Sequence, residues 1–181
     1  MSVDAFIGAD FVVAQLEVPF EAIEQAFKIA RKQNITTVLN PAPAIELPKS
    51  LLELTDIIIP NETEAELLTG ISINNESDMK ETATYFLNLG ISAVLITLGE
   101  QGTYCAYQEQ YKMIPACNVK AIDTTAAGDT FIGAFLSELN KDLSNLESAI
   151  RLANQASSLT VQRKGAQASI PTRKEVEAEY N

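Results

Sequence analysis

The 181 residues carry a formal net charge of −11, with 46% hydrophobic and 20% charged residues, a composition typical of a globular domain with a sizeable core. A surface this acidic repels nucleic acid and anionic membranes, so neither is expected to be a partner. The absence of histidine excludes a Ser-His-Asp or Cys-His catalytic centre, and two cysteines alone suggest neither a zinc site nor a disulfide framework.

The first hundred residues alternate short apolar runs with amphipathic stretches. Runs rich in β-branched residues predict four strands, at residues 11–16, 35–39, 56–59 and 91–98. Helical spacing of apolar residues, with proline or glycine at several boundaries, predicts helices at about 19–33, 48–54, 62–69 and 77–89. Residues Phe11, Val12, Val13 and Leu16 of the first strand read as buried on both faces. This order of elements predicts an α/β fold with a mostly parallel sheet flanked by helices.

The pattern changes after the fourth strand. Residues 102–107 and 110–115 predict a β-hairpin, and a further short strand is expected near residues 119–122. Three helices are expected at about 128–139, 145–161 and 172–179. No linker divides the chain, so we expect one domain over residues 1–181. No apolar run is long enough to span a bilayer and the N-terminus lacks a secretory pattern, so a cytoplasmic protein is expected.

Polar and turn residues follow each strand of the predicted parallel sheet. These loops comprise residues 15–17, 40–43, 60–62 and 97–100. Ligands of such sheets bind at the carboxyl ends of the strands, so these loops are expected to form a binding rim.

The strongest motif runs from Asp123 into an apolar helix. Ala126, Ala127 and Gly128 carry little bulk, so their amides and the helix dipole are suited to hold a phosphoryl group. Asp129 follows in the first turn, where a carboxylate can accept a hydroxyl proton. The spacing by itself slightly favours a plain helix start, with Thr125 as N-cap.

Three other segments also allow an ordinary structural interpretation. Asn61 and Glu64 have the spacing of a helix capping box, which the residue types alone favour about two to one. Residues 97–102 suit the end of a strand and a turn into the hairpin. Glu17 suits a first-turn acid before a helix that begins near Pro19.

The segment Asp123-Thr-Thr-Ala-Ala-Gly-Asp129 resembles the C-terminal signature of the ribokinase family, also called the PfkB carbohydrate kinases. Segments 40–44, 60–64, 96–99 and 163–167 are similar to the family in order and spacing, so the resemblance covers about residues 10–171. It implies a ribokinase-like fold and ATP-dependent phosphoryl transfer to a sugar hydroxyl. D-ribose, giving ribose 5-phosphate, is the favoured substrate, and another specificity such as that of fructokinase stays open.

The resemblance also implies roles for individual residues. Asp129 would be the catalytic base and contact the sugar together with Glu17, and the anion hole would consist of Ala126, Ala127 and Gly128. The implied contacts to ATP and Mg²⁺ are Asn61, Glu64, Thr97, Leu98, Gly99, Glu100, Gln101, Gly102, Gly128 and Asn154. The implied site for K⁺ comprises Asp123, Thr125, Thr160, Arg163, Gly165 and Ser169.

Members of that family carry a further N-terminal portion, with a Gly-Gly sugar-binding signature and a β-lid, that this sequence does not show. We therefore expect the ATP-binding part of a kinase, truncated at its N-terminus. The alternative is a non-catalytic nucleotide-binding fragment that needs a partner chain, because a kinase that cannot close over its substrate is ineffective. An uncovered edge at the first strand further predicts self-association.

Overall fold

A computed structural model describes residues 3–180. Its six-stranded sheet follows the order of the chain, β1-β2-β3-β4-β5-β6. The strands are β1 (Phe11–Ala14), β2 (Thr36–Leu39), β3 (Ile57–Ile58), β4 (Ala93–Thr97), β5 (Thr103–Tyr107) and β6 (Gln110–Ile114). The first four pair in parallel, which confirms the mostly parallel α/β sheet.

Contacts within the chain divide it into two compact units, which are described separately. Among the described residues, the first unit comprises 3–98 and 104–112, and the second comprises 99–103 and 113–180. No helix of the described residues is long and apolar enough to cross a membrane.

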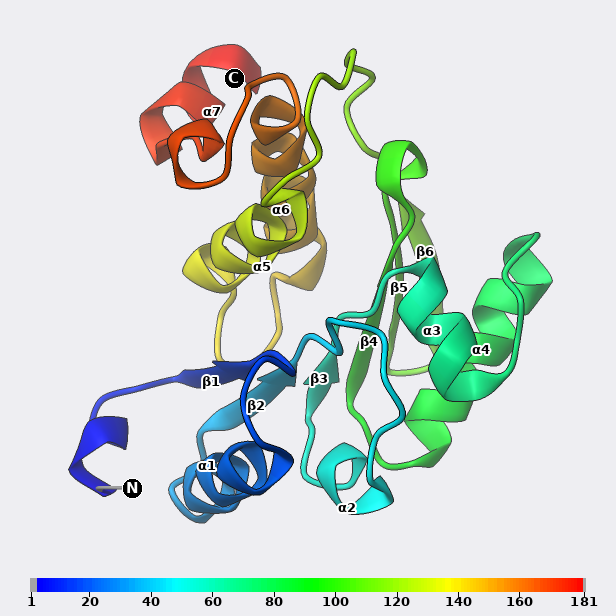
Figure 1. Cartoon of the computed structure of the whole chain (residues 1–181), viewed down its shortest axis with the longest axis vertical. Coiled ribbons are helices and arrows are strands. Elements are labelled where there is room, and N and C mark those ends of the chain that lie inside the picture. The colour runs from blue at the N-terminus through cyan, green and yellow to red at the C-terminus, as the bar shows by residue number, and fades with distance from the viewer. Residues whose placement is uncertain (1–2, 181) are drawn as a thin grey trace. The chain divides into compact units, whose positions relative to one another are not determined.

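The first unit carries a short 3-10 helix, Val3–Phe6, and the helices α1 (Phe20–Lys32), α2 (Lys49–Leu52), α3 (Glu62–Thr69) and α4 (Glu76–Asn88). α1 begins directly after Pro19 and buries Ile23, Phe27 and Ala30, which recur at helical spacing. Figure 1 shows α1 and α2 on one face of strands β1–β3. α3 and α4 pack against each other and against β4.

Strand β1 differs from the sequence prediction. It lies at one end of the sheet order, ends at Ala14, and leaves Val13 47% exposed, so the interpretation as buried on both faces is wrong. Val12 packs against the core cluster of Phe6, Ala30 and Ile35. Val13 points to the opposite face, because successive side chains of a strand alternate.

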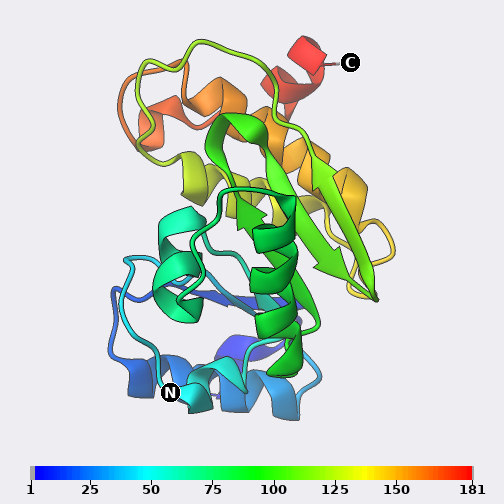
Figure 2. The same ribbon diagram turned by 90° about the vertical axis from the view of Figure 1, so that its right-hand side faces the viewer.

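Strands β5 and β6 form the predicted hairpin. They are neighbours in the sheet and are joined by Gln108 and Glu109, whose φ angles of 49° and 61° match a type I′ turn. The rings of Tyr104 and Tyr111 lie with their centroids 6.5 Å apart. Figure 2 shows the hairpin as two long neighbouring strands.

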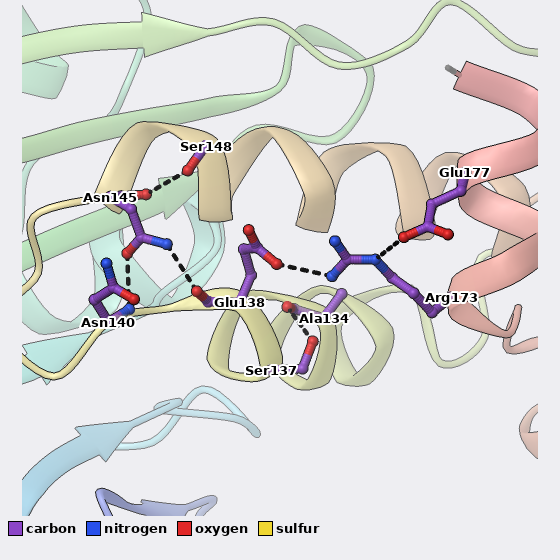
Figure 3. Close-up of polar contacts among 8 residues, drawn as sticks. All are labelled: Ala134, Ser137, Glu138, Asn140, Asn145, Ser148, Arg173 and Glu177. Atoms are coloured by element: carbon purple, nitrogen blue, oxygen red, sulfur yellow. Dashed lines mark hydrogen bonds and ion pairs between the residues drawn. The ribbon is translucent and has the colours of Figure 1, made fainter.

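The second unit is helical. α5 (Ala127–Glu138) and α6 (Leu146–Thr160) make the most extensive contact between any two elements, and α7 (Arg173–Tyr180) packs on α6. Figure 3 shows the Arg173 guanidinium at the start of α7, donating hydrogen bonds to the carboxylates of Glu138 and Glu177. These bonds are 2.8 and 2.7 Å long. Short 3-10 helices occupy Gly99–Gln101 and Gln167–Ser169.

The strand predicted near residues 119–122 is absent from the described structure. The amides of Ile122 and Asp123 both donate to the carbonyl of Val161, at 2.7 and 3.1 Å. This segment therefore runs past the C-terminal end of α6, and its backbone is paired there instead of beside a strand.

Candidate active site

Polar groups link the carboxyl ends of the parallel strands in the first unit. The Gln15 side-chain amide donates to the Asn40 side chain at 2.9 Å, and Asn40 donates in turn to the carbonyl of Ile59 at 2.8 Å. Thr97 donates its amide to the Pro60 carbonyl at 2.9 Å. The predicted rim loops are thus joined directly, with Asn40 as a link that the sequence did not single out.

Asn61 and Glu64 form a reciprocal capping box at the start of α3. Asn61 Oδ1 accepts from the Glu64 amide, and Glu64 Oε2 accepts from the Asn61 amide, each at 2.9 Å. Glu64 is only 5% exposed. Burial raises the pKa of the Glu64 carboxyl, although the hydrogen bonds from Asn61 act against this shift. The capping role is therefore confirmed, and contact with Mg-ATP stays a prediction.

The remaining predicted residues of the first unit differ in exposure. Glu17 is exposed between β1 and α1, as an acid that contacts a substrate would be. Thr97 is half-buried at the end of β4, and Leu98 after it is 2% exposed. Leu98 therefore belongs to the core, and its contact with ATP stays a prediction.

The loop of residues 99–102 in the second unit has a demanding backbone. Gly102 has a φ of 111°, and a Cβ there would collide with the carbonyl of Ile114 and the amide of Ala116. Only glycine fits this close approach. A Cβ on Gly99 would meet nothing within 4 Å, and Glu100 and Gln101 are exposed. One side of the loop is thus packed on the chain while the other is open.

Asn154 ties this loop to the end of β6. Its Oδ1 accepts from the Thr103 hydroxyl at 2.9 Å, and its Nδ2 donates to the carbonyls of Ile114 and Pro115 at 3.1 and 3.2 Å. Asn154 is only 6% exposed. Both donors of this amide are used within the protein, a bracing role that the sequence did not reveal.

The start of α5 carries the three residues predicted to form an anion hole, and its N-cap is Ala126 and not Thr125, so that expectation is wrong. Ala126 adopts the left-handed conformation, with a φ of 62°, which is uncommon for a residue with a Cβ. The Ala127 amide donates to the Thr124 carbonyl at 3.2 Å, so this donor is engaged. No hydrogen bond joins the Gly128 amide to another described residue, and a Cβ there would meet nothing within 4 Å. Among the three residues predicted for the anion hole, Gly128 is therefore the most open to a ligand.

Asp129 is exposed in the first turn of α5 and is one of the residues that line a cavity of about 310 Å³. Other residues lining this cavity come from one side of α5, from α6 and from α7, and include Gly133, Ser137, Leu152, Ala156 and Val176. The carboxylate thus lies beside space that a small molecule can enter.

Asp123 closes the loop predicted to hold potassium. Its two carboxylate oxygens accept from the amides of Thr125 and Gly165, at 2.9 and 3.0 Å. Hydrogen bonds from the Thr125 hydroxyl, then from the Gly165 and Thr125 amides, lower the pKa of Asp123 to about 2. The carboxylate is therefore ionised at neutral pH and joins two segments distant in sequence.

The other three residues predicted for potassium point their side chains at protein groups. Thr160 shares a hydrogen bond with Thr130 at 3.0 Å, Arg163 pairs with Glu175 at 2.7 Å, and Ser169 donates to the Ala166 carbonyl at 2.6 Å. The described residues contain no cluster of three or more His, Cys, Asp or Glu suited to a metal ion.

A family model described as pfkB family carbohydrate kinase matches residues 3–173 of the chain. The chain belongs to the pfkB family of carbohydrate kinases. The ribokinase of Staphylococcus aureus is 65% identical over 173 residues, which cover 96% of this chain and 57% of that relative. The ribokinase of Haemophilus influenzae is 46% identical over 167 residues, which cover 92% of this chain and 54% of that relative.

Solved structures of this pfkB family agree. The ribokinase of Arabidopsis thaliana complexed with ribose and ATP matches with a TM-score of 0.91 and 32% identity, over 97% of this chain and 57% of that one. The ribokinase of Thermotoga maritima matches with a TM-score of 0.86 and 34% identity, over 98% of this chain and 59% of that one. These findings confirm the ribokinase-like fold and the resemblance drawn from residues 123–129. The chain spans a little over half the length of these relatives.

Proposed function

We propose that this chain is the nucleotide-binding, phosphoryl-transferring part of an ATP-dependent kinase that converts D-ribose to ribose 5-phosphate. The observation that carries the proposal is the start of α5, where the open Gly128 amide precedes the exposed Asp129 carboxylate. A donor and a base side by side suit the two tasks of phosphoryl transfer, charge stabilisation and proton removal. The 65% identity to a ribokinase supports ribose as the acceptor.

In the proposed reaction, Asp129 accepts the proton of the sugar hydroxyl while the hydroxyl oxygen bonds to the γ-phosphorus of ATP. The bond from this phosphorus to the β,γ-bridging oxygen breaks in the same step, and that oxygen leaves with ADP. The Gly128 amide and the α5 dipole stabilise negative charge on the transferred group. A carboxylate is a weak base, which is sufficient where the proton leaves late in a loose transition state.

The nucleotide contacts form the second part of the proposal. Asn61 and Glu64 would act on the phosphates and on Mg²⁺, which supplies charge neutralisation when bound. Thr97, the loop of residues 99–102 and the region around Asn154 would contact ATP, the open side of Gly99 leaving room for it. Glu17 would contact the sugar.

A potassium ion at the loop that Asp123 closes is the third part of the proposal. The ionised Asp123 would provide negative charge, and backbone carbonyls of the predicted residues would provide the hard oxygen atoms that such a cation prefers. We propose a cytoplasmic location, where ATP is available and where thiols outside disulfides, such as those of Cys105 and Cys117, stay reduced.

A second candidate is a nucleotide-binding subunit that is not itself catalytic. It is favoured by one observation, that the Ala127 amide proposed for the anion hole already donates to the Thr124 carbonyl at 3.2 Å. The first candidate predicts catalytic turnover once the rest of the family fold is supplied, and the second predicts none.

The test is to co-express this chain with the part of the Staphylococcus aureus ribokinase that it does not match, and to assay ATP-dependent phosphorylation of D-ribose and D-fructose. We expect turnover with ribose above fructose. Asp129→Asn should lower turnover by about 10²–10⁴-fold, since a general base is removed, with ATP binding nearly intact. A folded, ATP-binding complex that phosphorylates neither sugar would favour the non-catalytic subunit. Full turnover by Asp129→Asn would reduce Asp129 to a helix-start residue.

A further inference from the structure

Helix α6 bonds to the first turn of α5 through two hydroxyl groups. The Ser157 hydroxyl donates to the carbonyl of Ala127 at 2.9 Å. One turn further along α6, the Thr160 and Thr130 hydroxyls lie 3.0 Å apart and share a hydrogen bond. Ala127 and Thr130 flank Gly128 and Asp129 in sequence. The contacts of α6 therefore fall on both sides of the two residues proposed to carry the chemistry.

The same helix also holds the loop of residues 99–102. Asn154, three residues before Ser157, bonds to Thr103 directly after this loop and to Ile114 and Pro115, which pack against Gly102. Steps of three residues keep neighbouring side chains on adjoining parts of the helix surface. One side of α6 thus touches both parts of the second unit that the proposed function assigns to ATP.

The packing around these contacts is tight. Thr160 is fully buried and Thr130 is 5% exposed, so their hydrogen bond is shielded from water. Ala149, Ala153 and Ala156 are buried on α6, and small side chains let two helices approach closely. The left-handed Ala126 also needs support, because such a conformation persists only where neighbouring structure holds it.

We infer that α6 is a brace that fixes the anion-hole turn of α5 relative to the loop of residues 99–102, with Ser157 and Thr160 as positioning residues. This inference rests on the proposed function for its consequence, which is that Mg-ATP binds a site already in place. Neither hydroxyl needs to touch the nucleotide. Their effect passes through the carbonyl of Ala127 and the hydroxyl of Thr130.

The chain provides a matched control one residue away. Ser158 is buried, and its hydroxyl donates to the Asn154 carbonyl at 2.7 Å within α6 itself. Ser158→Ala therefore removes the same chemical group from the same helix without removing a bond to α5. Ser157→Thr keeps the hydroxyl and serves as the conservative rescue.

The experiment compares wild type, Ser157→Ala with Thr160→Val, Ser158→Ala and Ser157→Thr in the full chain. The first readout is amide hydrogen exchange at Thr130, which donates to Ala126 at 2.9 Å, and at Ala127. The second is the Kd for Mg-ATP from calorimetry. Loss of two hydrogen bonds from α6 should speed exchange at these amides by roughly tenfold and raise the Kd by about three- to tenfold. Ser158→Ala and Ser157→Thr should stay within about twofold of wild type.

Exchange and Kd in the double variant that match those of Ser158→Ala would overturn the brace. So would an equal acceleration in Ser158→Ala, because it would show a general loosening of α6. If wild type does not bind Mg-ATP, the proposed function fails, and exchange at Thr130 and Ala127 alone still decides whether the brace exists.

Discussion

Asp123 shows how one side chain can join two distant segments. Each of its carboxylate oxygens accepts a backbone amide, one from Thr125 and one from Gly165. These bonds favour the ionised form, which is why they lower its pKa. Because the pKa is lower in the folded protein, the stabilisation is fully present above the unfolded value of about 3.9 and is lost as the pH falls towards the folded value.

Asp123→Asn is therefore expected to lower the Tm at pH 7, and the difference from wild type should shrink as the pH falls from about 4 to about 2. Thermal unfolding of dilute samples across this pH range measures it. Asp142→Asn is the comparison for a purely local contact, because Asp142 accepts from Ser144 two residues away and its pKa is also lowered. Its Tm difference should shrink in the same direction, without the loss of a link to a distant segment such as Gly165. A Tm difference that does not change with pH would show that the Asp123 charge is unimportant.

The role of a residue was predictable from the sequence where its hydrogen-bond partners are close in the chain. Asn61 and Glu64 have capping-box spacing, and they form that box. The hydrogen bonds of Asn154 were not predictable, because their partners Thr103, Ile114 and Pro115 are 39 to 51 residues away in the chain. Nothing in a single helix pattern indicates such partners.

At the scale of elements, two substitutions separate the capping role of Asn61 at the start of α3 from its proposed contact with Mg-ATP. Serine caps a helix about as well as asparagine, whereas alanine does not cap. Asn61→Ala should cost about 1 kcal/mol of stability. Asn61→Ser should cost only a few tenths of a kcal/mol, and it should still weaken Mg-ATP binding if the amide contacts the phosphates.

Denaturant unfolding and calorimetry of the two variants measure these effects. Asn75→Ser is the matched control, because Asn75 caps α4 by accepting from the Ser77 and Asp78 amides. Equal Mg-ATP binding by Asn61→Ser, Asn75→Ser and wild type would leave Asn61 with the capping role alone.

Boundaries of helices and strands were predictable where the chain marks them. Gly70 ends α3 in the left-handed conformation, and the hairpin turns at Gln108 and Glu109 between the two predicted strands. The strand expected near residues 119–122 is absent, and the amides of Ile122 and Asp123 donate to the Val161 carbonyl instead of to a strand. An apolar run indicates a strand only when another strand lies beside it.

At the scale of the whole molecule, β1 is an edge of the described sheet with the apolar Val13 47% exposed. Exposed edges pair with other chains unless charge or proline protects them. We expect the purified chain to self-associate, and Val13→Lys to shift it towards the monomer. Sedimentation velocity at several concentrations measures both, with Leu67→Lys as the matched control, because Leu67 is 46% exposed on the helix α3 and not on a sheet edge. A strictly monomeric wild type with a sharp thermal transition would contradict this expectation.

The fold class followed from the alternation of strands and helices, whereas the exposure of Val13 did not. A β-branched run reads alike in a central strand and in an edge strand, and only the order of strands in the sheet decides between them.

Binding of Mg-ATP tests the central claim most directly, that this chain carries the nucleotide site of a sugar kinase. The measurement is calorimetry of the folded wild-type chain at millimolar Mg-ATP, with Asp129→Asn alongside. We predict saturable heat with a Kd on the order of 1 mM for both proteins, because the amides and not the base hold the phosphates. A folded sample that gives no binding heat and no thermal shift with Mg-ATP would contradict this claim.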